Sequence, residues 1–125
     1  MSSALRQSDS EAAHAVAGRL AVARRAFLDV VDFIVARSRT HPNAVYAGSV
    51  PYLMLAGNLV AGWQLARSLL AAEECLAAGE DAGFMAAKIA TARFYAEHVL
   101  TRTGGLRDTI VDGAGAVNDV ALEDF

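Results

Sequence analysis

Apolar residues recur every three or four positions along the first third of the chain, as on one face of an α-helix. This seam consists of Val16, Leu20, Ala23, Phe27, Val30 and Ile34 and runs on to Arg37. Ser8-Asp-Ser-Glu11 fits a capping box at its start. The helix should end near Thr40 because Pro42 disfavours helical backbone in the residue before it, which predicts a loop over residues 41–48.

The pattern changes after Ser49, a candidate cap for a second helix. Apolar side chains between Tyr52 and Trp63 point in almost every direction, so this helix is apolar all round. Such a helix is buried on every side, either at the centre of a bundle or against a second partner. Asn58 is the lone polar interruption, and we expect it to have a structural role.

A third helix is predicted between Gly79, a natural stop for the helix before it, and the pair Gly104-Gly105. It should begin near Glu80 or Asp81, because an acidic cap suits the helix dipole. Glycine costs about 1 kcal/mol relative to alanine in a helix, so the helix should weaken at the pair and then resume or bend. No stretch alternates like a strand. The fold class is therefore all-α, an up-down helical bundle of three long helices plus a shorter or continuing C-terminal helix.

Residues 8–121 are predicted to form a single helical-bundle domain, with a flexible N-terminus at residues 1–7 and a loose tail at residues 122–125. The chain has 125 residues, 54% of them hydrophobic, which allows a real core without disulfides or metals. The polar N-terminus does not resemble a secretory signal, and the most apolar stretch is shorter than the roughly 20 residues that span a bilayer. We therefore expect a soluble, cytoplasmic protein with no membrane span.

Charge and cysteine content exclude several classes of function. The net charge of -3 argues against a nucleic-acid partner, which normally meets a basic face. Cys75 is the single cysteine, so the chain can form neither an internal disulfide nor a cysteine-based metal site. Glu11 and His14 form one Glu-x-x-His step, but a di-iron bundle requires two such steps and two further glutamates. No metal ligands are predicted.

Arg93 and His98 match the arginine, four-to-six residues, histidine pattern of the HEPN ribonucleases, which are also small helical bundles. In that chemistry the histidine handles the proton of the attacking hydroxyl and the arginine stabilises the phosphate charge. Five positions along a helix place two side chains roughly 140° apart, which is not one face. This geometry argues against a shared site, so a stand-alone ribonuclease using Arg93 and His98 is kept only as the alternative function.

Two segments resemble consecutive helices of a known domain. The first contains Tyr52, Leu53, Gly57, Gly62, Trp63, Ala66 and Arg67, and the second runs AKIATARFYAE from Ala87 to Glu97. These motifs are similar to those of the extra C-terminal helical domain found on a subgroup of large acyl-CoA dehydrogenases. The resemblance covers nearly the whole chain and is most specific from Tyr46 to Leu100.

The resemblance implies a non-catalytic accessory domain. In such enzymes FAD and substrate are held by an upstream dehydrogenase core, whose carboxylate base takes the α-proton. The added bundle packs on that core, stands where a second dimer would sit in the ordinary tetramer, and supports assembly. The parent enzyme would oxidise an acyl-CoA thioester at the α,β-carbons. No catalytic, cofactor-binding or metal residue, and no cofactor, is therefore predicted in this chain.

The resemblance also supplies a partner for the all-round apolar helix. That partner is a dehydrogenase core, in the same chain or as a separate subunit, and a homo-oligomer is expected. Arg93, Glu97 and His98 then form the polar edge of a packing helix, with an ion pair between Arg93 and Glu97 four positions apart. The predicted interface residues are Tyr46, Tyr52, Met54 and Trp63.

Overall fold

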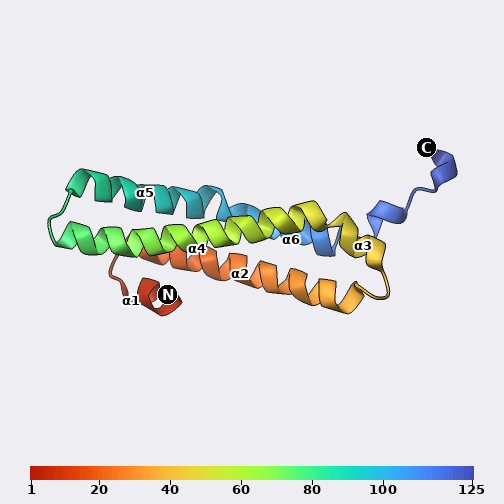
Figure 1. The fold of residues 1–125 in the computed structure, drawn as a ribbon, viewed down its shortest axis with the longest axis horizontal. Coiled ribbons are helices and arrows are strands. Elements are labelled where there is room, and N and C mark those ends of the chain that lie inside the picture. Colours follow the sequence, from red (N-terminus) through yellow and green to blue (C-terminus); the bar gives the residue numbers. More distant parts are fainter.

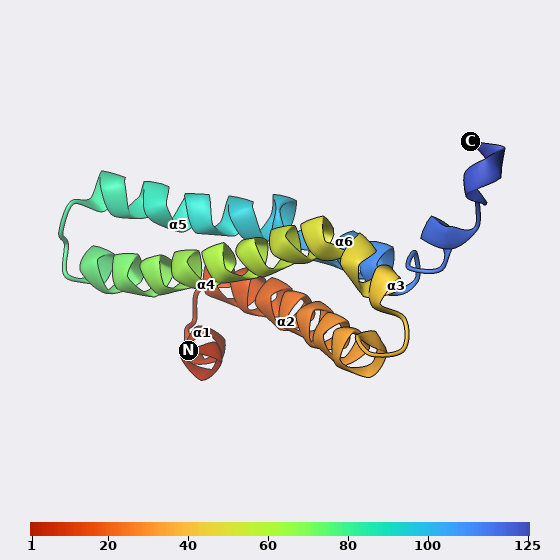
Figure 2. The same cartoon turned by 45° about the vertical axis from the view of Figure 1, so that its right-hand side comes forward.

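The computed structural model describes residues 1–125 and consists of helices joined by short turns. Three long helical rods lie side by side (Figures 1 and 2). They are formed by α2 (Glu11–Arg37), α4 (Ser49–Ala77) and α5 (Ala82–His98), the last continued in line by α6 (Thr103–Val111). The prediction of an all-α, up-down bundle with a continuing C-terminal helix is confirmed.

Two short helices lie where no helix was predicted. Residues 1–7, expected to be flexible, contain α1 (Ser2–Gln7), and the buried side chain of Leu5 joins the main core. The loop predicted over residues 41–48 contains α3 (Pro42–Ala47). Proline favours the first position of a helix because its φ is preset and its missing N–H would be unpaired there. Pro42 therefore begins a helix here as well as ending the previous one.

The core is divided into two clusters along the bundle. The smaller joins Val30, Leu55 and Ile110 from α2, α4 and α6. The larger joins α1, α2, α4, α5 and the 3-10 turn after α5 through Leu5, Ala12, Ala13, Val16, Ala23, Ala66, Leu69, Ala92, Ala96 and Leu100. Many of these residues are alanines, which lets the helices approach closely. The predicted seam of α2 is confirmed from Val16 to Ile34, because these members are buried or packed against the two clusters, whereas Arg37 at its end is exposed.

The start of α2 differs in detail from the predicted capping box. Ser10 is the N-cap, and its hydroxyl accepts a hydrogen bond from the Ala13 backbone N–H at 3.2 Å. Ser8, predicted as the cap, lies before the helix and donates to the Glu73 carboxylate of α4 at 3.1 Å. Its role is therefore to tie the incoming chain to α4. Ser49 is likewise the first residue of α4 and not its cap.

The third rod breaks before the glycine pair and not at it. A 3-10 turn (Leu100–Arg102) separates α5 from α6, and Gly104 and Gly105 lie in the first turn of α6. The buried hydroxyl of Thr103 donates to the Leu100 carbonyl at 2.7 Å, in competition with the regular backbone pairing. After α6 only two further 3-10 turns follow, at Ala116–Asn118 and Leu122–Asp124.

Candidate interaction surface

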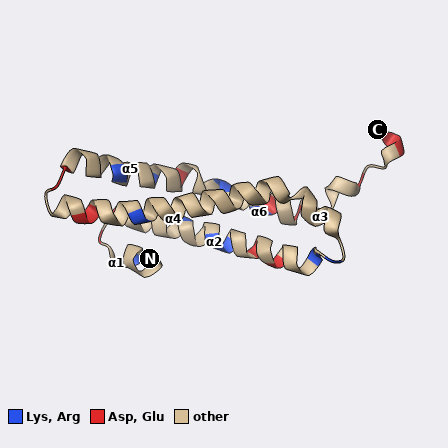
Figure 3. Ribbon diagram, in the orientation of Figure 1, with Lys and Arg blue, Asp and Glu red and all other residues tan.

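The outer face of the first half of α4 is apolar and exposed. No Lys, Arg, Asp or Glu occurs between residues 40 and 66, and Figure 3 shows this half of the ribbon without charge. The exposed residues follow heptad-like steps of three and four, which puts them on one side of a helix. We call this side the outer seam; it consists of Val50, Leu53, Met54, Gly57, Val60, Ala61 and Gln64.

The opposite side of α4 has the same kind of spacing and is buried. Leu55, Gly62, Ala66 and Leu69 make this inner seam and pack against the other helices. The bundle therefore uses one of the two apolar seams, and the outer seam has no partner within the chain. An apolar area of this kind is typical of an interaction surface.

The four predicted interface residues do not form one patch. Tyr46 is 70% exposed on α3, and Met54 is 54% exposed on the outer seam. Tyr52 is half-buried, with its ring stacked on Phe27 of α2 at 5.9 Å between centroids. Trp63 is 44% exposed and lines a groove at the edge of the outer seam, which Val60 also lines. The outer seam also contains Val50, Leu53 and Val60, which are not among the predicted interface residues although their regular spacing is visible in the sequence.

Trp63 lines a groove between α1, α2 and α4 that has a volume of about 560 Å³. We call it the α1 groove. Its lining is mostly apolar, and Arg24 is its only charged residue. The guanidinium of Arg67 lies over the Trp63 ring, 5.2 Å from its centroid. Neither arginine forms an ion pair within the chain. The groove therefore combines apolar walls with unpaired positive charge.

Arg93 and His98 are not arranged as a catalytic pair. The Arg93 guanidinium donates to the carboxylates of Glu97 at 3.2 Å and Glu11 at 3.3 Å. The hydrogen bond that Arg93 donates to Glu97, together with the negative charges of Glu97 and Glu11, raises the pKa of Arg93. The ring of His98 stacks on Phe94 at 4.3 Å. The predicted ion pair between Arg93 and Glu97 is present, and the arginine's donors are held by carboxylates.

Arg107 forms ion pairs with Asp29, Asp108 and Asp112, so its charge is also compensated within the chain. No three His, Cys, Asp or Glu side chains gather closely enough to hold a metal ion, and Glu11 is instead paired with Arg93. Asn58 contributes its backbone carbonyl, which accepts a hydrogen bond from the Tyr95 hydroxyl at 3.0 Å. None of the helices has the length and apolar character needed to cross a membrane.

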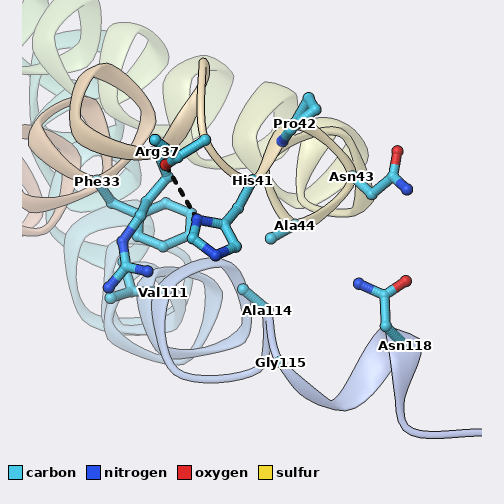
Figure 4. Close-up of a pocket in the computed structure, with 11 residues that line it drawn as sticks. Phe33, Arg37, His41, Pro42, Asn43, Ala44, Val111, Ala114, Gly115 and Asn118 are labelled. Atoms are coloured by element: carbon cyan, nitrogen blue, oxygen red, sulfur yellow. Dashed lines mark hydrogen bonds between the residues drawn. The ribbon is translucent and has the colours of Figure 1, made fainter.

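A second depression, of about 440 Å³, lies at the α3 end of the bundle (Figure 4). Arg37, His41 and Asn118 are among its polar residues, and His41 Nδ1 lies 3.0 Å from the Thr40 hydroxyl. Both α2 and α6 end here, so the negative ends of two helix dipoles face the depression. Arg37 in the last turn of α2 offsets that charge.

Comparison with known proteins identifies a larger relative. Residues 2–121 match the family described as acetyl-CoA dehydrogenase C-terminal-like. A 3-methylmercaptopropionyl-CoA dehydrogenase of Ruegeria pomeroyi is 52% identical over 111 residues, which cover 89% of this chain and 19% of that protein. This chain thus spans a small part of the relative's length. No solved structure matches it.

Proposed function

This chain belongs to the family of acetyl-CoA dehydrogenase C-terminal-like domains, and from that premise we propose that it is a non-catalytic accessory domain of a flavin-dependent acyl-CoA dehydrogenase. In this role it packs on the dehydrogenase core and supports assembly of the enzyme. The parent enzyme oxidises an acyl-CoA thioester at the α,β-carbons, a reaction class consistent with the name of the Ruegeria pomeroyi relative.

The observation that carries this proposal is the unpartnered outer seam of α4. Leu53 and Val60 project from it, whereas Gly57 and Ala61 between them add almost no bulk. A helix of the core can therefore approach the α4 backbone closely, with its side chains between the projecting residues. Docking would bury apolar area without desolvating any charged group on this face, and charged groups are the ones that are costly to bury.

The flavin is assigned to the core because neither depression of this chain fits it. A dinucleotide pyrophosphate is best held by the N–H groups at a helix N-terminus. The depression in Figure 4 receives the C-terminal ends of α2 and α6, and the one helix that begins there, α3 (Pro42–Ala47), is only six residues long. The α1 groove is mostly apolar, with Arg24 as its single charge. When bound in the core, FAD supplies the electron acceptor for the oxidation, and the residues of this chain act by packing.

A chimera tests the proposal. The matching C-terminal segment of the Ruegeria pomeroyi relative is replaced by this chain, and native mass and FAD per subunit are measured by light scattering and absorbance. We expect the chimera to assemble and retain FAD. Leu53→Asp in the chimera should disrupt assembly or release FAD, because docking would bury an unpaired carboxylate.

Val35→Asp is the matched control, since Val35 is an exposed apolar residue on α2, away from the outer seam. This substitution should leave the mass and the FAD content of the chimera unchanged. Circular dichroism of both variants of the isolated chain shows whether the bundle itself still folds. The proposal is wrong if the Leu53→Asp chimera assembles and holds FAD as well as the unmodified chimera does.

A further inference from the structure

Residues 115–125 form a segment that combines apolar side chains with acidic ones, and we call it the acidic segment. It contains Asp119, Glu123 and Asp124, and no Lys or Arg follows Arg107. Leu122 and Phe125 are 82% and 92% exposed, although both are strongly apolar. Figures 1 and 2 show the segment projecting from the α3 end of the bundle, away from the helices. These side chains have no cover within the chain.

The backbone conformation at the end of the acidic segment separates its apolar side chains from its carboxylates. Leu122–Asp124 is a 3-10 turn, and the Phe125 N–H donates to the Leu122 carbonyl at 3.4 Å. Side chains three positions apart are eclipsed in a 3-10 turn. Leu122 and Phe125 therefore lie on the same side, whereas Glu123 and Asp124 point elsewhere. The turn presents an apolar pair flanked by two carboxylates.

The α1 groove has the complementary character. Its walls are apolar, Arg24 is its single charged lining residue, and Arg67 stacks on Trp63 beside it. Both arginines lack an ion-pair partner in the chain. No acidic residue lines the groove to repel a carboxylate. An apolar side chain entering the groove would therefore be accompanied by favourable charge pairs at its edge.

We propose that the acidic segment of one copy of this chain docks into the α1 groove of a second copy. Leu122 and Phe125 enter the groove next to Trp63, and Glu123 and Asp124 pair with the arginines. A second copy is the occupant because the segment leaves the bundle at its α3 end and points away from its own groove (Figures 1 and 2). The α1 groove shares Val60 with the outer seam but does not include Leu53, so Leu53→Asp distinguishes this contact from docking on a dehydrogenase core.

Sedimentation of the full chain over a wide concentration range tests the proposal. Trp63 is the only tryptophan, so its emission reports the groove directly. We expect self-association accompanied by a blue shift of the emission. Leu122→Ala/Phe125→Ala should weaken association about tenfold or more and abolish the shift, since aromatic and aliphatic anchors dominate such contacts. Val35→Ala, an exposed apolar residue outside both surfaces, should change neither quantity.

A charge reversal gives a second, independent readout. Arg24→Glu should weaken association, and Arg24→Glu/Asp124→Arg should restore it, because groove and segment again carry opposite charges. The proposal is overturned if the chain stays monomeric at millimolar concentration. It is also overturned if Leu53→Asp abolishes association while Leu122→Ala/Phe125→Ala does not. A blue shift that is independent of concentration but lost in the double variant would mean that the segment folds onto its own chain, which equally contradicts docking between copies.

Discussion

Two faces of α4 invite comparison because their compositions are alike. The inner seam presents Leu55 and Leu69 to the other helices, and the outer seam presents Leu53 and Val60 to solvent. Leu55 is fully buried at 0% exposure, whereas Leu53, two residues earlier on the same helix, is 72% exposed. Nothing in the residue types distinguishes the two faces. The difference arises from the bundle, which supplies neighbours on one side of α4 only.

The comparison shows how a helix can be apolar all round without being fully buried in its own domain. In a small bundle a central helix would be covered on every side, but three rods cannot surround one of their own members. The second seam of α4 is then free for a partner outside the bundle. This is why the outer seam, and not a cluster of polar residues, is the basis of the functional proposal.

Alanine substitutions of the two leucines should give the largest contrast. Leu55→Ala removes a side chain packed with Val30 and Ile110 and should cost about 2–5 kcal/mol of unfolding free energy. Leu53→Ala should cost less than about 0.5 kcal/mol, because its side chain has no neighbours to lose. Urea unfolding followed by circular dichroism, at a dilution that suppresses association, measures both. Similar costs for the two variants would show that the outer seam is packed within the chain.

The two glycines of α4 extend the contrast to the backbone. A Cβ at Gly62 would lie 2.9 Å from the buried Leu100 side chain, so Gly62→Ala should cost about 1–3 kcal/mol. Gly57 has nothing within 4 Å, so Gly57→Ala should instead stabilise the isolated chain by up to about 1 kcal/mol through helix propensity. Thermal unfolding of both variants gives the signs. Equal effects would mean that the faces do not differ in packing.

Sequence reasoning succeeded where a periodic pattern and a single physical cause coincide. The seam of α2 has one apolar stripe, so its buried face followed directly from the spacing. Gly79 ends α4 as predicted, with the positive φ of 76° that favours glycine. The motifs from Tyr52 to Arg67 and from Ala87 to Glu97 carried the family resemblance, and the family match confirms it.

The remaining features depend on contacts that no local pattern encodes. Helix α1 is held on the bundle by Leu5, whose side chain packs in a cluster with residues from distant parts of the sequence. The break at Leu100–Arg102 precedes the glycine pair. The Leu100 side chain packs against Gly62, and the Thr103 hydroxyl competes with the helical backbone N–H for the Leu100 carbonyl. Two apolar seams on α4 were visible in the spacing, but only the bundle decides which one is buried. The predicted interface residues Tyr52 and Trp63 were therefore separated from Met54.

The smallest predicted difference in unfolding free energy between paired variants is for a substitution at the boundary between the two faces of α4. Asn58 lies at this boundary, and the Tyr95 hydroxyl of α5 donates to its backbone carbonyl. Tyr95→Phe removes this interhelical hydrogen bond and should cost about 0.5–1.5 kcal/mol of unfolding free energy at neutral pH. Tyr46→Phe is the matched control, because Tyr46 is exposed and its hydroxyl donates no hydrogen bond within the chain.

Burial of Tyr95 makes stability depend on pH in one direction. Burial raises the pKa of Tyr95 in the folded chain above its ordinary value of 10.0. As the pH rises past 10, the hydroxyl therefore ionises first in the unfolded chain, which favours unfolding. The stabilisation is complete below that pH and is lost as the pH rises through the folded-state pKa. Chemical unfolding between pH 8 and 11 should show a steeper loss for the wild type than for Tyr95→Phe. If the wild type and Tyr95→Phe lose stability equally over this pH range, Tyr95 is not buried against α4, and the exposed face of α4 extends further toward α5.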